Sequence, residues 1–366
     1  MNFKSIRRAA VPGVAALALA LSACGGGSDD SSSDSEAAEL SGELSIGGAS
    51  SQQSAQDAWI VGFQDVAPDV TVSYDPTGSG TGRENFVSGA FPIAGSDAYL
   101  NDEEGELTAA KEQCGGSVIE IPNYVSPIAV IFNVEGVEDL NLSPDALAGI
   151  FAGKITKWND PAIVETNEGV DLPDAAITPV HRSDDSGTTE NFTDYLDAVA
   201  GEQWTHGVIE TWPGEAGGEA GEGTSGVVQV VTENANTIGY ADASQAGGLG
   251  QANIGVGEEF VAPSSEAAAK ILEVSPRVED RDETDMAFDL DHSTSEAGTY
   301  PIVLTSYLLA CPSYEDQNTA DLVKAYMDYI VSDEGQELAE SEAGSAPLSD
   351  DLQAEAQEII DGISAG

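Results

Sequence analysis

Short apolar runs alternate along the chain, from residue 43 onward, with longer segments in which apolar residues recur every three or four positions. Runs of the first kind predict buried strands, and segments of the second kind predict amphipathic helices. The strand-like runs are LSIGG, VTVSY, PIAGSD, SVIEI, PIAVIFNV, ITPVHR, NTIGYAD and PIVLTSYLLA. The helix-like segments are SQQSAQDAWIVGF, GTGRENFVSG, SPDALAGIFAG, SSEAAAKILEV and the stretches near 102–112, 187–199, 319–331 and 350–361. This alternation predicts an α/β protein with parallel sheets.

Two internal segments show neither pattern. Residues 214–226 are rich in glycine and glutamate and low in complexity, and residues 279–298 are acidic with little periodicity. Both compositions predict loops.

The N-terminus has the pattern of a targeting segment over residues 1–23. Three basic residues precede an apolar stretch over 9–21 that is short for a membrane span. The segment ends in Leu-Ser-Ala before Cys24, which resembles the lipobox of bacterial lipoproteins and implies a lipidated Cys24. The alternative is an ordinary cleaved signal peptide with an incidental cysteine. Residues 24–41 are predicted to form a flexible acidic linker.

Composition narrows the classes of function. The chain has 366 residues, and its 41% hydrophobic content allows two domains with sizeable cores. Its formal charge is −53, which excludes binding to nucleic acid or an anionic membrane through a broad basic surface. Removal of residues 1–23 leaves nine cations against 65 acids, a charge of −56. Self-repulsion of this size suggests a salty working medium.

Two cysteines remain if Cys24 carries a lipid. In an exported protein, Cys114 and Cys311 are expected to form a disulfide, with two free buried thiols as the alternative. Their spacing is too wide for a metal motif, and the three histidines are scattered, so no metal site is expected.

Three predicted strand-to-helix turns share a composition of glycine and hydroxyl side chains. They are residues 47–51 (GGASS), 77–82 (TGSGTG) and 183–189 (SDDSGTT). Glycine lets a ligand approach the backbone, and the free N–H groups of a helix N-terminus attract anions. One such turn is more simply explained as an N-cap. Three of them favour a small tetrahedral anion, and the fingerprints of nucleotide binding are missing.

Two charged residues bear on this interpretation. Arg182 precedes the third turn, where a guanidinium can donate two parallel hydrogen bonds to an oxyanion and Asp184 can hold it in place. Its alternative role is a surface ion pair. Asp97, after PIAGS, would repel an anion unless the ligand donates a proton to it; by itself it is more simply an N-cap.

Together these motifs resemble the phosphate-binding proteins of bacterial phosphate ABC transporters. The resemblance extends from about residue 47 to 360, and its most specific element, RSDDSGT at 182–188, matches the family's R-x-D-x-S-G-T. Further matches are GSG at 78–80, GSD at 95–97, FAGKITKW at 151–158 and IGY at 238–240. The first turn departs from the family's G-A-T-F, because Ser51 stands at the aromatic position.

The resemblance implies a phosphate site without metal or cofactor. The implied contacts are Ser50, Ser51 through its N–H, Ser79, Asp97, Arg182, Ser186, Gly187 and Thr188, with Asp184 supporting Arg182. Arg83 is a further charge just beyond the second turn.

The resemblance also implies a two-lobed periplasmic-binding-protein fold of type II-like topology. Each lobe would hold a mixed, mainly parallel sheet flanked by helices, and the ligand would lie in the cleft between the lobes. Residues 42–125 and 298–366 would form lobe I and residues 126–297 lobe II. The chain would cross between them near 122–126 and 299–301.

The sequence therefore predicts an exported, monomeric, lipid-anchored receptor that binds inorganic phosphate and delivers it to an ABC permease, with membrane contact through its lipid only. A receptor for a sulfate-like oxyanion is the first alternative. A surface hydrolase or phosphatase, with Ser186 as nucleophile and His181 or His206 as base, is less favoured because the chain lacks a Gly-x-Ser-x-Gly elbow. An adhesin with a vestigial site is the third alternative.

Overall fold

A central mixed sheet organises the computed structural model, which describes residues 40–103 and 105–366. The signal peptide, Cys24 and nearly all of the predicted linker lie outside the described residues. The strand order is β2-β1-β3-β12-β4-β8-β6-β7, with β9 pairing β4. These strands are β1 Gly42–Gly48, β2 Val70–Asp75, β3 Ile93–Ser96, β4 Ile119–Asn133, β6 Thr178–Arg182, β7 Glu219–Gly221, β8 Thr237–Asp242, β9 Gly250–Gln251 and β12 Val303–Ala310.

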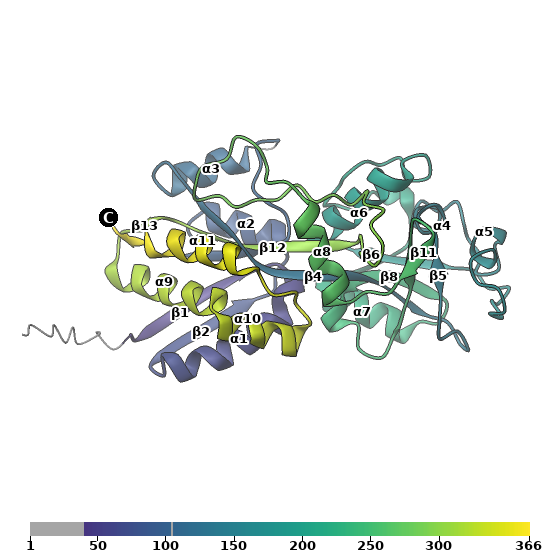
Figure 1. The fold of residues 1–366 in the computed structure, drawn as a ribbon, viewed down its shortest axis with the longest axis horizontal. Helices are drawn as coiled ribbons and strands as arrows, with labels where there is room; N and C mark the ends of the chain where they lie inside the picture. Colours follow the sequence, from purple (N-terminus) through teal and green to yellow (C-terminus); the bar gives the residue numbers. More distant parts are fainter. Residues whose placement is uncertain (1–39, 104) are drawn as a thin grey trace, which may run out of the picture. The chain divides into compact units, whose positions relative to one another are not determined.

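Strand β4 connects two lobes because it pairs with a different neighbour along each half of its length. Residues 119–127 pair antiparallel with β12, and residues 128–133 pair antiparallel with β8. The first lobe holds β1, β2, β3 and β12, and the second holds β6, β7 and β8 (Figure 1). Pairs β1–β2, β1–β3, β6–β7 and β6–β8 are parallel. The two-lobed α/β fold is thus confirmed. The strands β4 and β12 pair antiparallel because the chain crosses between the lobes in one direction along β4 and in the other along β12.

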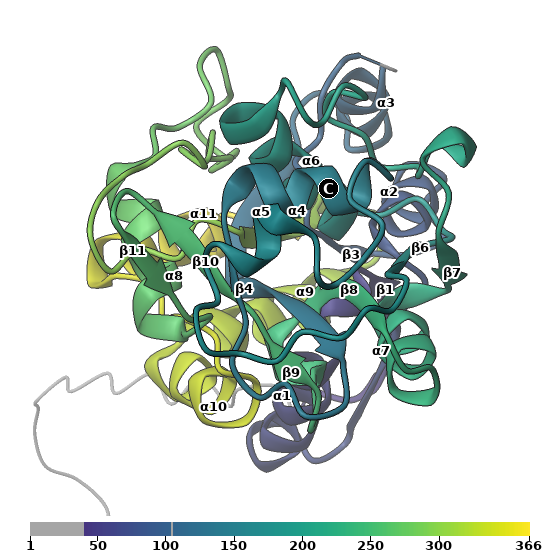
Figure 2. The ribbon, with the colours of Figure 1, turned by 90° about the vertical axis from the view of Figure 1, so that its right-hand side faces the viewer.

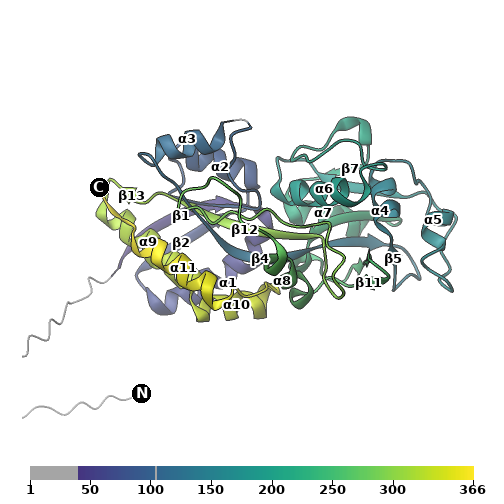
Figure 3. The same ribbon diagram turned by 45° about the horizontal axis from the view of Figure 1, so that its top comes forward.

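Helices cover both faces of the first lobe's strands. Successive residues of β12 point to opposite faces of the sheet: Leu308 belongs to the hydrophobic core that also contains Trp59 of α1, and Leu309 belongs to a separate core that contains Phe86 of α2. Helices α9, α10 and α11 lie along the same side as α1 (Figure 3). The helices are α1 Gln53–Val66, α2 Ser79–Val87, α3 Glu106–Gln113, α9 Gln317–Val331, α10 Asp333–Ala343 and α11 Asp350–Asp361, with a short strand pair, β13 Ser313–Tyr314 and β14 Ser364–Ala365.

The second lobe repeats this layering. Along β4, Val130 shares a core with Phe192 of α6, and Ile131 shares one with Val227 of α7 on the opposite face (Figure 2). The helices are α4 Pro144–Phe151, α5 Pro161–Val164, α6 Gly187–Ala200, α7 Gly223–Glu233 and α8 Ser265–Val274. A small sheet joins β5 Asn141–Leu142, β10 Asn253–Val256 and β11 Glu259–Val261. Short 3-10 helices are η1 Ser50–Gln52, η2 Gly214–Ala216 and η3 Ala243–Gln245.

Several segments differ from the sequence-based prediction. The two strands predicted for SVIEI and PIAVIFNV form the single long strand β4. Residues 214–226 are not simply a loop, because they contain η2, β7 and the first turn of α7. Helix α10 was not predicted, because its amphipathic pattern is masked by five acidic positions. Residues 279–298 have neither helix nor strand, as predicted.

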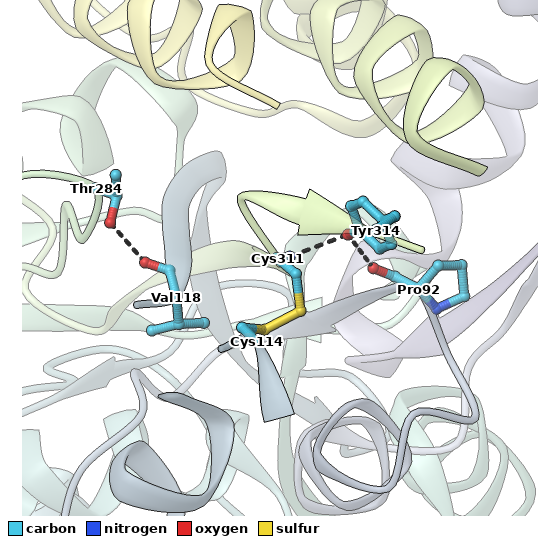
Figure 4. Close-up of a disulfide and its surroundings, with 6 residues drawn as sticks. All are labelled: Pro92, Cys114, Val118, Thr284, Cys311 and Tyr314. Atoms are coloured by element: carbon cyan, nitrogen blue, oxygen red, sulfur yellow. Dashed lines mark hydrogen bonds between the residues drawn. A yellow bond between two sulfur atoms is a disulfide. The ribbon is translucent and has the colours of Figure 1, made fainter. Parts of the chain in front are cut away.

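The expected disulfide between Cys114 and Cys311 is confirmed, with the two Cα atoms 5.0 Å apart (Figure 4). Cys114 follows α3, and Cys311 follows β12. Tyr314 supports the bond's surroundings, since its hydroxyl accepts from the backbone N–H of Cys311 at 3.0 Å and donates to the carbonyl of Pro92 at 2.7 Å (Figure 4). The bond joins two segments of the first lobe that are distant in sequence.

Candidate anion-binding site

Asp97 lies at the centre of a buried group of hydroxyl side chains. It directly follows β3, and only 2% of its surface is exposed. Its Oδ1 accepts hydrogen bonds from the hydroxyls of Ser51 and Ser306, each at 2.6 Å, and its Oδ2 accepts from Thr188 at 2.8 Å. Ser51 and Ser306 belong to the first lobe and Thr188 to the second, so both lobes contribute to the site.

The first glycine-rich turn meets this group through Ser51 and the second through Ser79, whereas Ser50 of the first turn contacts the second lobe. Ser79 is the first residue of α2, and its hydroxyl accepts from the N–H of Asp97 at 3.1 Å. Gly78 before it has φ 97°, which glycine adopts without steric cost. The Ser50 hydroxyl accepts from the N–H of Thr224, in the first turn of α7, at 3.0 Å. Helix N-termini of both lobes therefore point to one place.

Arg182, at the end of β6, is held by Asp184. The guanidinium donates to both carboxylate oxygens of Asp184, from Nε at 2.8 Å and from Nη2, and Nη1 lies 3.4 Å from the Thr188 hydroxyl. Burial acts to raise the pKa of Asp184, but the hydrogen bonds and charge of Arg182 outweigh it and hold that pKa below its usual value. A buried, oriented guanidinium thus stands beside the hydroxyl group.

The third turn begins α6 with Ser186, Gly187 and Thr188. The Ser186 hydroxyl caps the helix by accepting from the N–H of Thr189 at 3.1 Å. A Cβ at Gly187 would lie 2.7 Å from the backbone nitrogen of Ala98, so only glycine lets α6 approach the first lobe this closely. Asn191 of α6 also joins this helix to the first lobe, because its side-chain amide donates to the carbonyl of Asp97 at 2.9 Å.

The electrostatics of Asp97 suit proton exchange with a ligand. Burial raises the pKa of Asp97 above its usual value, while the hydroxyls of Ser306, Ser51 and Thr188 and the charge of Arg182 act in the opposite direction. The site therefore supplies hydrogen bonds to the Asp97 carboxylate, while its burial disfavours the negative charge.

Arg83 lies outside this group, although it too is buried. Its Nε donates to Glu106 at 2.8 Å, its Nη2 to Glu210 at 2.6 Å, and its Nη1 to the Ser96 hydroxyl at 3.2 Å. The pair with Glu210 joins the two lobes.

Sequence reasoning missed Thr224 and Ser306. Thr224 lies in a Gly-Thr-Ser-Gly run that forms the first turn of α7. This run has the same composition as the three predicted turns, but its low-complexity surroundings concealed it. Ser306 lies within a continuous apolar strand, where nothing in the sequence distinguishes it from a core position.

The residues considered for a hydrolase have other partners. Ser186 caps α6, whereas His181 stacks on Trp212 and bonds through Nδ1 to the carbonyl of Arg182 at 2.8 Å. His206 packs edge-on against Trp204. Within residues 40–103 and 105–366, no three His, Cys, Asp or Glu side chains are arranged to hold a metal ion. In the same ranges, no helix has the length and hydropathy to cross a membrane.

Comparison with known proteins decides the family. A model of the PBP superfamily domain matches residues 33–334. Phosphate-binding protein PstS2 of Mycobacterium bovis is 34% identical over 97% of this chain and 98% of its own length. The chain belongs to the PstS family of phosphate-binding proteins. Phosphate-binding protein PstS3 of Mycobacterium bovis is 32% identical, again over 97% of this chain.

Solved structures of PstS-like fold agree with the two-lobed architecture. A high-affinity periplasmic phosphate-binding protein bound with phosphate covers 88% of this chain and is itself covered to 99%, with a TM-score of 0.71 at 20% identity. A phosphate-binding protein from Stenotrophomonas maltophilia covers 87% of this chain, is covered to 94% and has a TM-score of 0.66 at 19% identity. The family consists of solute receptors, so the hydrolase alternative lacks support.

Proposed function

We propose that this chain is an extracytoplasmic receptor that binds inorganic phosphate and delivers it to an ABC permease. The observation that carries the proposal is the buried Asp97 carboxylate within a group of hydroxyls and beside Arg182. Phosphate near neutral pH still has a proton to donate to a carboxylate, whereas sulfate has none. The names of the relatives, which are phosphate-binding proteins, support the same ligand.

The residues proposed to bind phosphate are those named from the sequence. Arg182 would bind the negatively charged oxygens of the tetrahedral anion. The N-termini of η1, α2 and α6 would supply N–H and hydroxyl donors. The donors are Ser50, Ser51 through its N–H, Ser79, Ser186, Gly187 and Thr188. Because these donors come from both lobes, closure of the lobes around the anion would complete the site. The proposed lobes are residues 42–125 with 298–366, and residues 126–297.

We also propose that Cys24 carries a lipid that anchors a monomeric receptor to the outer face of the cytoplasmic membrane. The Leu-Ser-Ala-Cys motif supports lipidation, and the disulfide between Cys114 and Cys311 fits an oxidising compartment. Cys24→Ser should leave the protein unprocessed or released. A variant that still partitions into detergent at its mature mass would contradict the anchor.

Calorimetric titration of the purified protein with phosphate, arsenate and sulfate at fixed ionic strength tests the function. Phosphate and arsenate should bind with 1:1 stoichiometry, and sulfate should give almost no heat. Comparable affinities for phosphate and sulfate would reject the phosphate assignment in favour of a general oxyanion receptor.

A further inference from the structure

Two serine hydroxyls that are distant in the sequence share one oxygen of the Asp97 carboxylate. Ser51 of η1 and Ser306 of β12 each donate to Oδ1 of Asp97 at 2.6 Å. Both serines are fully buried. A carboxylate oxygen has two lone pairs, so these two donors occupy Oδ1 completely. A hydrogen bond from a ligand to Asp97 must therefore go to Oδ2.

Gln52 fixes the direction of the hydrogen bond between Ser306 and Asp97. The side-chain nitrogen of Gln52 lies 3.3 Å from the backbone carbonyl of Tyr307, which can only accept, so this end of the amide is the NH₂ group. The same nitrogen donates to Ser306 Oγ at 2.7 Å. The Ser306 oxygen thus accepts from Gln52, and its one hydrogen is left for Asp97.

Gln52 is held in turn by further buried amides. Its Oε1 accepts from the side chain of Gln56 at 2.8 Å and from that of Asn123 at 3.2 Å, and all three side chains are fully buried. A chain of hydrogen bonds, each donating in the same direction, therefore runs through the core of the first lobe and ends on Asp97. Buried polar groups cost stability that apolar residues would not, so the chain is more than a means of filling this core.

We propose that Ser306 and Ser51 are positioning residues that make Asp97 select an anion carrying a proton, an inference that rests on the proposed function. Because Oδ1 is occupied by donors, the carboxylate is held in its ionised form. Oδ2 receives one donor in the structure, Thr188 at 2.8 Å, and keeps a lone pair for the proton of phosphate.

The same two hydroxyls oppose the binding of sulfate. Sulfate brings no proton, so it can lie against Asp97 without an unpaired, repelled oxygen only if the carboxyl group itself takes up a proton. Burial raises the pKa of Asp97 and favours that uptake, whereas the hydrogen bonds from Ser306 and Ser51 act against it. Loss of either hydroxyl should therefore admit sulfate.

The test compares two hydroxyl deletions with a matched control on the same strand. Ser306→Ala removes one donor to Oδ1, and Ser51→Ala removes the other while keeping the backbone N–H proposed to bind phosphate. Thr305→Val is the control, because Thr305 is buried next to Ser306 and its hydroxyl has no hydrogen-bond partner among the described residues. Calorimetry measures phosphate affinity directly and sulfate affinity by displacement of phosphate, at fixed ionic strength.

In each alanine variant the ratio of phosphate affinity to sulfate affinity should fall at least about fivefold, mainly because sulfate binds better. Thr305→Val should keep the wild-type ratio. A merely structural role would weaken both anions by the same factor. A ratio in Ser306→Ala equal to that in Thr305→Val would overturn the proposal for Ser306, and Ser51→Ala tests the donor pair without altering β12.

The pH dependence of phosphate binding gives a second measurement that needs no sulfate. Between pH 4.5 and 8, the loss of phosphate affinity on acidification should begin at a higher pH in the alanine variants, because Asp97 without a donor is protonated more readily. The other charged and titratable groups around Asp97, like phosphate itself, are the same in every variant. They are Tyr74 of β2, Arg83 of α2, Arg182 of β6 with Asp184, and Glu190 of α6.

An acid limb at the same pH in wild type and both alanine variants would also overturn the proposal. These outcomes are distinguishable from failure of the proposed function. A wild type that binds phosphate and sulfate equally refutes the function, whereas a selective wild type with unchanged alanine variants refutes only the role of the two serines.

Discussion

Thr188 and Asp97 are 91 residues apart in the sequence, yet the Thr188 hydroxyl donates to Oδ2 of Asp97 at 2.8 Å. Thr188 lies in the first turn of α6 of the second lobe, and Asp97 follows β3 of the first. This hydrogen bond brings a helix N-terminus, where an anion is favoured, against a buried carboxylate, where an anion is disfavoured. A ligand that is both an anion and a proton donor satisfies both groups.

Asp97→Asn should narrow the selectivity between phosphate and sulfate. A site built around a buried hydrogen bond rejects an analogue lacking that group by about 10⁴-fold or more. The amide keeps the shape of the carboxylate but supplies a donor and removes the negative charge, so sulfate binding should rise relative to phosphate. Competition calorimetry measures the ratio of the phosphate affinity to the sulfate affinity. A ratio unchanged from wild type would show that Asp97 does not select phosphate by accepting a hydrogen bond from its proton.

Arg182→Ala should weaken all tetrahedral anions together. The guanidinium recognises the negative charge and the positions of the anion's oxygens, whether or not the anion carries a proton. A hydrogen bond to a charged group contributes about 1.5–3 kcal/mol, roughly 10- to 100-fold in affinity. Phosphate and arsenate affinities measured by calorimetry should fall by similar factors. Arg277→Ala removes a surface ion pair with Glu355 and serves as the control that should bind normally. A loss confined to one anion would contradict this role.

Arg83→Gln should speed the release of phosphate. Arg83 joins the lobes through Glu210 at 2.6 Å, and its loss leaves the carboxylates of Glu210 and Glu106 without their cation. Truncating one partner of a buried charge pair acts mainly on dissociation and costs about 2 kcal/mol or more. Stopped-flow measurement should find dissociation at least about tenfold faster, with association changed less. Unchanged dissociation would mean that the pair does not hold the lobes together.

The stability of the phosphate-free protein should depend on pH in opposite ways through Asp97 and Asp184. The pKa of Asp97 is raised in the fold, so the unfolded chain loses this proton first as pH rises, and ionised Asp97 then destabilises the fold. Asp97→Asn should therefore gain stability over wild type as pH increases from about 4, the unfolded pKa, through the folded pKa.

The pKa of Asp184 is lowered, so its contribution is present above the unfolded pKa and is lost as pH falls through the folded pKa. Asp184→Asn should destabilise near neutral pH, and that cost should fade on acidification. Urea unfolding of both variants and the wild type from pH 3 to 8 measures these differences. Parallel pH profiles for the two variants would contradict the assignment.

Loss of the disulfide should destabilise the first lobe. Cys114 and Cys311 close a long loop, separated by 197 positions, and such bonds stabilise by about 2–4 kcal/mol. The double substitution Cys114→Ser and Cys311→Ser should lower the free energy of unfolding by this amount. Thiol titration of denatured, unreduced wild type should detect no sulfhydryl from the pair, and two reactive thiols would contradict the bond.

The sequence by itself determined the local parts of this protein. Periodicity predicted most helices and strands, because apolar spacing reflects which face of an element is buried. The three hydroxyl-rich turns were visible because each is a contiguous run at a strand-to-helix junction. The role of residues 182–188 came from a motif match, since the residues alone left a helix cap and a surface ion pair open as alternatives.

Only the tertiary structure decided which of these parts meet. Ser306 and Thr224 reach the site from segments whose composition indicated a core strand and a loop. The sequence left open whether Arg83, just beyond the second turn, reaches the ligand, and in the structure its charged partners are Glu106 and Glu210. The reason is that local patterns record the burial and conformation of a residue, whereas a site between two lobes depends on contacts between residues that are 46 to 209 positions apart, which no short-range pattern encodes.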